Sequence, residues 1–493
     1  MTPRPLTAVA TALAAATLLL LGSLPAQAQS SDTRTTYKVV PYVISDPALV
    51  EHPDKLVEEV KEHGDLDRLG IKPATENGPS RITGAKAART KAAAQATPAG
   101  YVVDSSRFPR GSVPADIFDY ATRDQCDDNS EAASADAGWI KNRYSYCQKH
   151  VLFMPAFECG IFPPRCRLSG TYASTNTLIG YGKTSGYESN PASSRWADFR
   201  LSVDNILTTG VFSGSGADLE ASIECEGNYL DDDFPETDEN ACFPGLNNET
   251  EKSINEWRRD SGAHFDVISQ ASEPDISHGA QIGTGVFHIE YEFDLPWYFQ
   301  ALDTESPEGG MRFDSAVYLG PGNSRMGSVF DRAVPGMAYR LGDAAVAGVA
   351  QHIDDARTDP DSTVPPRAFK NLVGATPVAP LHRLPGSRLM PAQRARVIDN
   401  RNVSTGFCGT IGMPPQPPTG GPFDCDEYPF ASTYEGAARF KYEPADQQAQ
   451  FRDQFSVRWV NRTVNREAGA RLGRWYGVDR ILDHEEFFLP IQP

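Results

Sequence analysis

The C-terminal part of the chain is organised around Asp424-Cys425-Asp426-Glu427-Tyr428-Pro429-Phe430-Ala431. This stretch brings three carboxylates within four residues beside a cysteine, and an aromatic residue and a proline end the acidic run. Carboxylate oxygens are the ligands that hard cations such as Mg²⁺ and Mn²⁺ prefer, and a carboxylate can also act as a general base. The stretch is therefore either part of a metal-dependent active site or an acidic turn, and its composition leaves both interpretations open.

The N-terminus has the pattern of a secretory signal. Arg4 gives a basic start, Ala8 to Leu21 form a short apolar run, and Ala26-Gln27-Ala28 is a typical cleavage site, so residues 1–28 are interpreted as the signal peptide. A retained anchor helix is the alternative. No later segment contains 18 consecutive apolar residues, so we expect a secreted, extracellular protein that has no membrane contact after signal cleavage.

Eight cysteines follow this signal. An even number of cysteines in an exported chain indicates disulfides rather than metal ligands, and the lack of a C-x-x-C pattern argues against a zinc ribbon. The cysteines are Cys126, Cys147, Cys159, Cys166, Cys225, Cys242, Cys408 and Cys425. Pairing each one with its neighbour in sequence gives 126–147, 159–166, 225–242 and 408–425, although the sequence alone allows many other pairings.

The charge is unevenly distributed. The whole chain has a formal net charge of −19, which by itself argues against a nucleic-acid partner. Residues 310–493, however, carry 21 Lys and Arg against 20 Asp and Glu, a net charge of +1, which leaves −20 for residues 1–309. The acidic excess therefore belongs to the N-terminal part, and the C-terminal part is free to bind a polyanion.

A chain of 493 residues is longer than one hydrophobic core usually serves, so we expect several domains. Residues 29–100 are predicted to be a leader or linker, or a propeptide, with an amphipathic helix over Pro47–His63. Residues 101–309 are predicted to form an acidic, sandwich-like β domain, because segments such as Phe287–Leu295 alternate strictly between apolar and polar residues. Its role is open: substrate capture, cell-wall attachment and autoinhibition all fit.

Residues 310–493 have a mixed pattern that predicts an α+β domain. Val346, Val349 and Ile353 define one face of a helix that continues to Arg357. Further along, the pattern predicts a strand over 455–460, a helix over 465–476 and a final strand over 480–489. This part has neither a Ser-His-Asp spacing nor a P-loop, so carboxylates, an Asn-Arg pair and arginines are its candidate chemistry.

Two motifs in this domain resemble a known family. Residues 426–437 read D-E-Y-P-F-A-S-T-Y-E-G-A, which is similar without a gap to the D-E-[WY]-P-x-A-x-x-x-E-G-[GA] signature of the secreted bacterial NucA/NucB deoxyribonucleases. Downstream, Asn465-Arg466-Glu467-Ala468-Gly469 resembles the D-N-R-x-x-G of that family, which opens a helix. The resemblance implies a ββα-metal nuclease fold for residues 310–493, with a looser likeness that extends back to Met311.

The resemblance also implies roles for individual residues. Asp426 matches the general base of the family and Asn465 its metal-binding asparagine. Glu427 matches a signature acid that lies at the metal or supports the base, and Glu435 a second signature acid that acts at the metal or holds the loop. Arg466 matches an arginine that would face phosphate, although an ion pair with Glu467 or Asp426 is an alternative. The implied cofactor is a divalent metal, Mg²⁺ or Mn²⁺.

The sequence departs from the family at several positions. Val464 stands where the family usually has Asp, and the pattern's two cysteines near the domain start are both absent from Arg312-Phe313-Asp314 and Gly327-Ser328-Val329-Phe330. The function that the resemblance implies is a secreted, metal-dependent, nonspecific endonuclease that hydrolyses DNA and leaves 5′-phosphates. RNA as a second substrate, and a cell-wall or inhibitor partner, stay open. The alternatives are a noncatalytic adhesion or wall-binding protein with a decayed nuclease domain, and a nuclease toxin.

Overall fold

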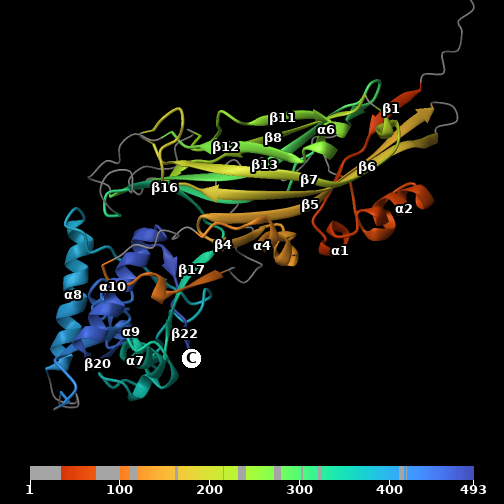
Figure 1. Cartoon of the computed structure of the whole chain (residues 1–493). Coiled ribbons are helices and arrows are strands. Elements are labelled where there is room, and N and C mark those ends of the chain that lie inside the picture. The colour runs from red at the N-terminus through yellow and green to blue at the C-terminus, as the bar shows by residue number, and fades with distance from the viewer. Residues whose placement is uncertain are drawn as a thin grey trace, which may run out of the picture.

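The computed structural model of the chain describes most residues after the predicted signal. They are residues 35–73, 100–111, 119–160, 165–191, 193–214, 216–230, 240–270, 279–300, 304–319, 325–409, 416–417 and 419–493. The predicted signal peptide and the linker residues 74–99 lie outside this set. The described part of the protein is mostly β with a few helices. Figure 1 shows two large sheets as an elongated β region, and several helices of the C-terminal part below one end of it.

The first large sheet contains nine strands. Its path runs β10-β12-β7-β6-β5-β1-β14, and β2 and β4 pair with β5 off this path. The strands are β1 (Thr36–Val39), β2 (Tyr42–Ile44), β4 (Trp139–Asn142), β5 (Ser145–Gly160), β6 (Arg165–Gly182), β7 (Trp196–Gly210), β10 (Phe243–Pro244), β12 (Gly262–Ile268) and β14 (Phe299–Gln300). All pairs in this sheet are antiparallel except β1 with β14.

The second large sheet contains six strands and shares its core with the first. Its members are β8 (Asp218–Glu226), β9 (Tyr229–Leu230), β11 (Glu249–Ser253), β13 (Ala280–Asp294), β15 (Gly309–Ala316) and β16 (Met326–Phe330). Side chains at alternate positions of β13, such as Phe287 and Ile289, join Phe199 and Leu201 of β7 in one buried apolar cluster. The predicted alternating strand over 287–295 is therefore confirmed, apart from its last residue.

The segment predicted as a leader includes part of this fold. β1 and β2 pair with β5, and the predicted helix over Pro47–His63 is two helices, α1 (Pro47–Val50) and α2 (Asp54–His63). The predicted amphipathic helix is confirmed in α2, whose Leu56, Val57 and Val60 are buried. Leu49 lies in the separate α1 because Pro53 interrupts the segment: proline has no backbone N–H, and it disfavours the helical conformation at the residue before it. Whether any of residues 29–100 is removed stays a prediction.

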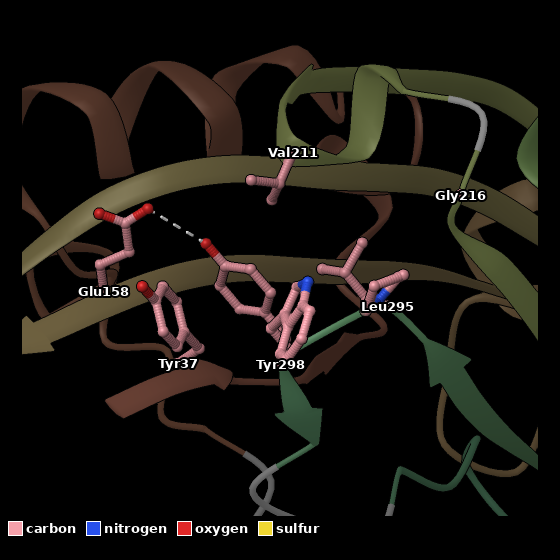
Figure 2. Close-up of a pocket in the computed structure, with 8 residues that line it drawn as sticks. Tyr37, Glu158, Val211, Gly216, Leu295 and Tyr298 are labelled. Carbon is pink, nitrogen blue, oxygen red and sulfur yellow. Dashed lines mark hydrogen bonds between the residues drawn. The ribbon is translucent and has the colours of Figure 1, made fainter. Parts of the chain in front are cut away.

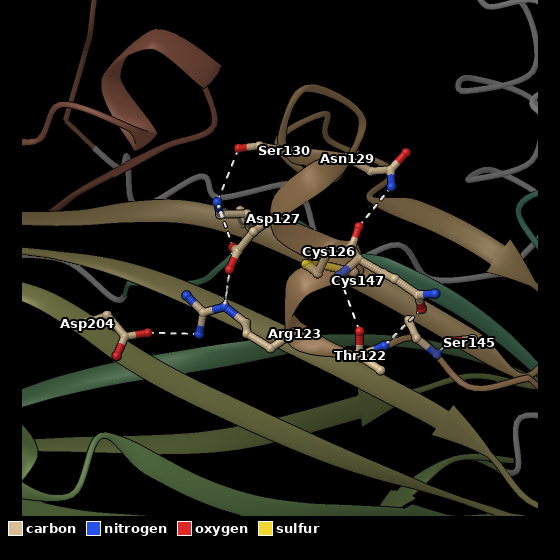
Figure 3. Close-up of a disulfide and its surroundings, with 12 residues drawn as sticks. Thr122, Arg123, Cys126, Asp127, Asn129, Ser130, Ser145, Cys147 and Asp204 are labelled. Atoms are coloured by element: carbon tan, nitrogen blue, oxygen red, sulfur yellow. Dashed lines mark hydrogen bonds and ion pairs between the residues drawn. A yellow bond between two sulfur atoms is a disulfide. The ribbon is translucent and has the colours of Figure 1, made fainter.

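All four predicted cysteine pairs are present, with Cα–Cα distances of 4.0 to 6.0 Å. Cys126–Cys147 attaches helix α4 (Arg123–Asp128) to β5 (Figure 3). Beside this disulfide, Arg123 donates to Asp127 of its own helix and to Asp204 of β7. The short helix α4 is thereby attached to two strands of the nine-stranded sheet.

The C-terminal region, residues 334–493, contains the longest described helices and forms three small sheets, one of them together with β3 of the N-terminal half. The sheets are β22-β17-β3, β18-β21 and β19-β20. Their strands are β3 (Gly100–Asp104), β17 (Val334–Arg340), β18 (Leu381–His382), β19 (Phe423–Tyr428), β20 (Ser456–Asn461), β21 (Glu486–Phe487) and β22 (Ile491–Gln492). The principal helices are α7 (Ala347–Thr358), α8 (Pro391–Cys408) and α10 (Arg462–Val478). The predicted α7, β20 and α10 are confirmed, although α10 begins three residues earlier than expected.

The remaining helices are short. They are α5 (Ser130–Ala133), α6 (Ile254–Arg259), α9 (Gln448–Phe451), and the 3-10 turns at Asp67–Leu69, Ser105–Arg107, Val211–Ser213, Pro360–Ser362 and Arg439–Lys441. No helix in the described part of the chain is long and apolar enough to cross a membrane.

The predicted final strand over Arg480–Leu489 was largely wrong, because its strand residues are confined to β21 and a bridge at Phe488. Arg480 and His484 have positive φ values of 48° and 62°, so the chain turns where a strand was expected. The buried Arg480 guanidinium bonds to Asp314 of β15, with Nε–O distances of 2.9 and 3.1 Å. This contact to a distant strand fixes the turn.

The predicted boundary between residues 309 and 310 falls inside a sheet. β15 begins at Gly309 and pairs with β13 along its whole length, and β16 pairs with β15. Conversely, β3 from the N-terminal half pairs with β17 of the C-terminal region. The proposed division into domains stays a prediction, but a fragment starting at residue 310 would separate β15 from its partner.

Candidate active site

The conspicuous acidic stretch forms β19, which pairs antiparallel with β20. Successive side chains of a strand point to opposite faces, so the two faces of this hairpin have different neighbours. On one face, Asp426 and Tyr428 contact α7 through His352 and Arg357. On the other face, Cys425 is joined to Cys408, the last residue of α8. Asp426 and Glu427 therefore face opposite sides of the hairpin.

Asp426 is held by a buried histidine. Its Oδ2 lies 2.6 Å from Nδ1 of His352, and Nε2 of His352 lies 2.8 Å from the Ser456 hydroxyl on β20. His352 is fully buried, whereas the Asp426 side chain is 7 % exposed. Within the described residues Oδ1 of Asp426 makes no hydrogen bond. This geometry orients one carboxylate oxygen and leaves the other available to a proton donor.

His352 cannot contact a substrate, because both of its ring nitrogens are occupied and its side chain is buried. Its role is instead to hold the carboxylate of Asp426 in one orientation. The sequence analysis missed this residue, although one signal was present: His352 lies between Val349 and Ile353 on the apolar face of a predicted helix. A histidine on such a face needs polar partners in the core.

Asp424 pairs with two arginines at the start of α10. Arg462 Nε lies 2.9 Å from its Oδ1, and Arg466 Nε lies 3.0 Å from its Oδ2. The Arg466 side chain remains 58 % exposed. The ion pair that the sequence allowed for Arg466 therefore exists, with Asp424 rather than Glu467 or Asp426 as its partner. Because both arginines are at the surface, their guanidinium groups remain accessible to an anion.

Helix α10 begins one turn before Asn465. Asn461 caps it, because its side-chain oxygen accepts from the backbone N–H groups of Thr463 and Val464. Asn465 is the fourth residue of the helix and is half-buried, and its side-chain amide makes no hydrogen bond to the described residues. Val464 packs against the apolar cluster formed by α7 and α10. A valine at this position thus has a packing role in place of the family's Asp.

Glu427 lies on the α8 face of the hairpin. Burial, and after it the negative charge of Asp426, raise its pKa to about 7, although the positive charge of Arg401 on α8 and a hydrogen bond from the Ala431 backbone oppose them. Glu427 is therefore partly protonated near neutral pH. A protonated carboxyl can donate a hydrogen bond, whereas an ionised one can bind a cation.

The loop after β19 is held by Asn400 of α8. Its side-chain amide donates to the carbonyl oxygens of Ala431 and Thr433 and accepts from the Ala438 N–H, at 2.9 to 3.1 Å. A Cβ atom on Gly436 would lie only 2.3 Å from Asn400 Nδ2. The glycine of the signature is thereby explained by the close approach of this asparagine.

Glu435 bonds to His382 rather than to the hairpin. Its carboxylate accepts from the His382 backbone N–H at 3.0 Å and lies 2.8 Å from the ring Nδ1. The carboxylate of Glu435, and after it that of Glu486, accept hydrogen bonds from the His382 ring and raise the pKa of His382 to about 9, and burial opposes them. This ion pair joins β18 to the signature loop, so Glu435 has at least the loop-holding role that the resemblance allows.

This pair predicts a pH dependence of stability. A histidine whose pKa is raised on folding stabilises the protein fully below the unfolded pKa of about 6.5. The stabilisation is lost as pH rises towards 9. Because the His382 side chain is 37 % exposed, we expect a loss of only about 1 kcal/mol in the free energy of unfolding. Urea unfolding between pH 6 and 9.5 would measure this loss in the free energy of unfolding.

His382→Gln is the test variant. His52→Gln is its control, because His52 is an exposed histidine of the N-terminal segment. His382→Gln should remove this part of the pH dependence, whereas His52→Gln should retain it. An unchanged slope in His382→Gln would show that the pair contributes nothing measurable.

The oxygen donors near the hairpin suit a hard cation. Two of them are Oδ1 of Asp426 and the side-chain amide of Asn465, which form no hydrogen bond within the described part of the chain and are ligand types that Mg²⁺ and Mn²⁺ take. Among the described residues, the three His, Cys, Asp or Glu side chains whose ligand atoms converge are elsewhere, namely Asp198, His264 and Asp266 of the nine-stranded sheet. A metal at the hairpin would thus depend on few protein ligands.

The acidic hairpin, the loop held by Asn400 and the capped helix α10 all lie in one continuous segment of the chain. Residues 391–489 match the family model for deoxyribonuclease NucA/NucB. The resemblance that the two motifs predict is thereby confirmed for this segment. The NucA/NucB match begins at the first residue of α8, so the looser likeness back to Met311 lies outside it. No curated protein and no solved structure matches the chain.

The NucA/NucB match supports a nuclease-type function with DNA as the substrate. Of the residues that the sequence singled out, Asp426 and Glu427 lie on β19, Asn465 and Arg466 on the first turns of α10, and Glu435 in the intervening loop. Arg466 reaches β19 through Asp424, whereas Glu435 is engaged with β18.

Proposed function

We propose that the protein is a secreted, metal-dependent, nonspecific endonuclease that hydrolyses DNA phosphodiester bonds. The observation that carries this proposal is Asp426, whose carboxylate is oriented by His352 and retains a free oxygen within the segment that matches NucA/NucB. The order β19, β20, α10 is also that expected of a ββα-metal nuclease.

In the proposed reaction, Oδ1 of Asp426 accepts a proton from the attacking water while Oδ2 stays bonded to His352. His352 thereby keeps the carboxylate in one orientation during the transfer. Asn465 would hold the divalent metal. When bound, Mg²⁺ or Mn²⁺ supplies charge stabilisation at the phosphate. Glu427 faces α8, so we assign it to the supporting acid rather than to direct proton transfer.

Arg462 and Arg466 are proposed to bind the phosphate backbone. Both are at the surface and share the single carboxylate of Asp424, so this group retains a net positive charge. Arginine forms bidentate hydrogen bonds with phosphate. Contacts to phosphate carry no sequence information, which agrees with a nonspecific nuclease and leaves RNA open as a second substrate.

The proposal is tested with the complete secreted protein and supercoiled plasmid DNA. In Mg²⁺ or Mn²⁺ we expect nicked and then fragmented DNA with 5′-phosphate ends, and EDTA should stop the reaction because the charge stabilisation is lost. Gel electrophoresis and end-labelling measure both outcomes. Undiminished digestion in EDTA would contradict the metal requirement. The absence of digestion with either metal would contradict the nuclease activity and favour the noncatalytic alternative.

A further inference from the structure

A pocket of about 540 Å³ lies at an edge of the β region, outside the segment that matches NucA/NucB. It is formed by parts of the chain that are distant in sequence, from β1 through β5 to the turn that follows β13. Its lining residues are Tyr37, Glu158, Val211, Gly216, Leu295, Pro296, Trp297 and Tyr298. Figure 2 shows Tyr37 and Tyr298 next to each other beside Glu158, and Val211 and Leu295 on the apolar side.

Trp297 is presented to solvent by a tight turn. The N–H of Tyr298 donates to the carbonyl oxygen of Leu295 at 2.9 Å, with Pro296 and Trp297 between them. Trp297 has a φ of 75°, a conformation that ordinarily selects glycine at the third position of a turn, and its side chain is 89 % exposed. Trp297 thus combines an unfavourable backbone conformation with an exposed apolar ring at the wall of a pocket, which motivates the hypothesis of a binding role.

Polar groups lie at the other side of the same pocket. The rings of Tyr37 and Tyr298 pack edge to face with centroids 5.2 Å apart, and the Tyr298 hydroxyl donates to Glu158 at 3.5 Å. Arg167 also pairs with Glu158, at 2.9 Å, and its side chain points largely into solvent. The pocket thus combines exposed aromatic surface with two hydroxyls and one carboxylate.

The aromatic and polar groups of this pocket favour one class of ligand over others. None of the described residues that line the pocket is Lys, Arg or His, and residues 1–309 have a net charge of −20, so a polyphosphate chain would be repelled. A purely apolar ligand would make no use of the Tyr37 hydroxyl or of the acceptor capacity that Glu158 retains beside Tyr298 and Arg167. A pyranose ring has a C–H face that stacks on an aromatic ring and hydroxyls at its edge that bond to Tyr and Glu.

We propose that this pocket binds a neutral saccharide, with Trp297 as the stacking platform and Glu158 as an acceptor for sugar hydroxyls. Its volume suits one or two sugar rings. The proposal is independent of the nuclease activity, because no residue of the pocket lies in the hairpin or in α10. Its consequence is that the β region would attach the protein to a polysaccharide surface.

The test uses the complete protein and three neutral probes: N-acetylchitotetraose, cellotetraose and maltotetraose. We expect at least one of them to bind in isothermal titration calorimetry and to shift tryptophan emission to shorter wavelength, because Trp297 becomes covered. Trp297→Ala should weaken that binding by about tenfold or more. Glu158→Gln, which keeps the shape but removes the charge, should weaken it by a smaller factor.

Phe369→Ala is the matched control. Phe369 is 91 % exposed and has a φ of 61°, and it lies outside the pocket. Phe369→Ala should leave saccharide binding unchanged, and Trp297→Ala should leave the rate of plasmid digestion unchanged. The proposal would be overturned if none of the three probes bound, or if Trp297→Ala bound as tightly as the parent protein. It would also be overturned if oligo(dT) bound in their place and this binding required Trp297, since the pocket would then stack nucleic-acid bases.

Discussion

Replacing Asp426 by Asn should lower kcat for DNA hydrolysis by about 10³-fold, a typical contribution of a general base. The amide has nearly the same shape as the carboxylate but cannot accept a proton from water. Its oxygen can still accept a hydrogen bond from His352, which lies 2.6 Å from the carboxylate in the parent protein. The fold should therefore be retained. Initial rates on plasmid DNA at saturating metal would measure the effect.

Two further variants separate catalysis from structure. Asp424→Asn makes the same change two residues away on the same face of β19, where the carboxylate pairs with Arg462 and Arg466. It should retain most of kcat. His352→Gln should lower kcat by roughly tenfold without raising KM, because it loosens the orientation of Asp426 and leaves the DNA-binding surface intact.

The activities of these three variants distinguish the competing explanations of the site. Full activity in Asp426→Asn would place the general base elsewhere. An equal loss in Asp424→Asn would show that any change in β19 disturbs the hairpin. A His352→Gln variant with parental kcat would show that the buried histidine serves packing alone.

The sequence located β20 and α10 because their apolar patterns are local. It marked residues 424–431 as part of an active site or as an acidic turn, and the structure places the end of strand β19 and the start of the following loop there. The sequence could not show how these residues pair. Asp426 meets His352, which lies 74 residues earlier, and Glu435 meets His382, which lies 53 residues earlier. Such contacts depend on tertiary packing, for which a single sequence holds no periodic signal.

The final strand was wrongly predicted for the same reason, because the conformation after α10 depends on a tertiary contact. The residues after α10 alternate sufficiently to predict a strand, but a buried charge at Arg480 needs a partner, and that partner is Asp314 on β15. The boundary predicted after Gly309 stays a prediction, although β15 begins there and pairs with β13. Composition changes near this point, whereas hydrogen bonding continues across it.

A group of buried charged side chains joins β15 to the turn after α10. Asp314 is fully buried and bonds to Arg480, with distances of 2.9 and 3.1 Å to Nε, and to Nη2 of Arg312 at 3.1 Å. Arg312 and Arg143 both pair with Glu485. Burial alone would raise the pKa of Asp314, but the charges of Arg480 and Arg312 outweigh it and hold the pKa below its usual value.

Asp314→Ala should therefore destabilise the protein by about 3–5 kcal/mol, because it leaves the guanidinium groups of Arg480 and Arg312 buried without that counter-charge. Urea unfolding at pH 7 with the disulfides intact would measure the change. Since the pKa of Asp314 is lowered on folding, its contribution is present above the unfolded pKa of about 4 and is lost as pH falls below it. The difference between variant and parent should accordingly shrink in acid.

Asp260→Ala is the matched control, because Asp260 pairs with Lys252 at 2.9 Å but its side chain is 76 % exposed. Removing this exposed pair should change the free energy of unfolding far less than Asp314→Ala does, because solvent screens the two charges. If Asp314→Ala were as mild as Asp260→Ala, the turn after α10 would be held by its apolar contacts, such as Ile481 and Phe487 in the core of the C-terminal region. A large loss confined to Asp314→Ala would instead establish that this buried ion group connects the β region to the nuclease segment.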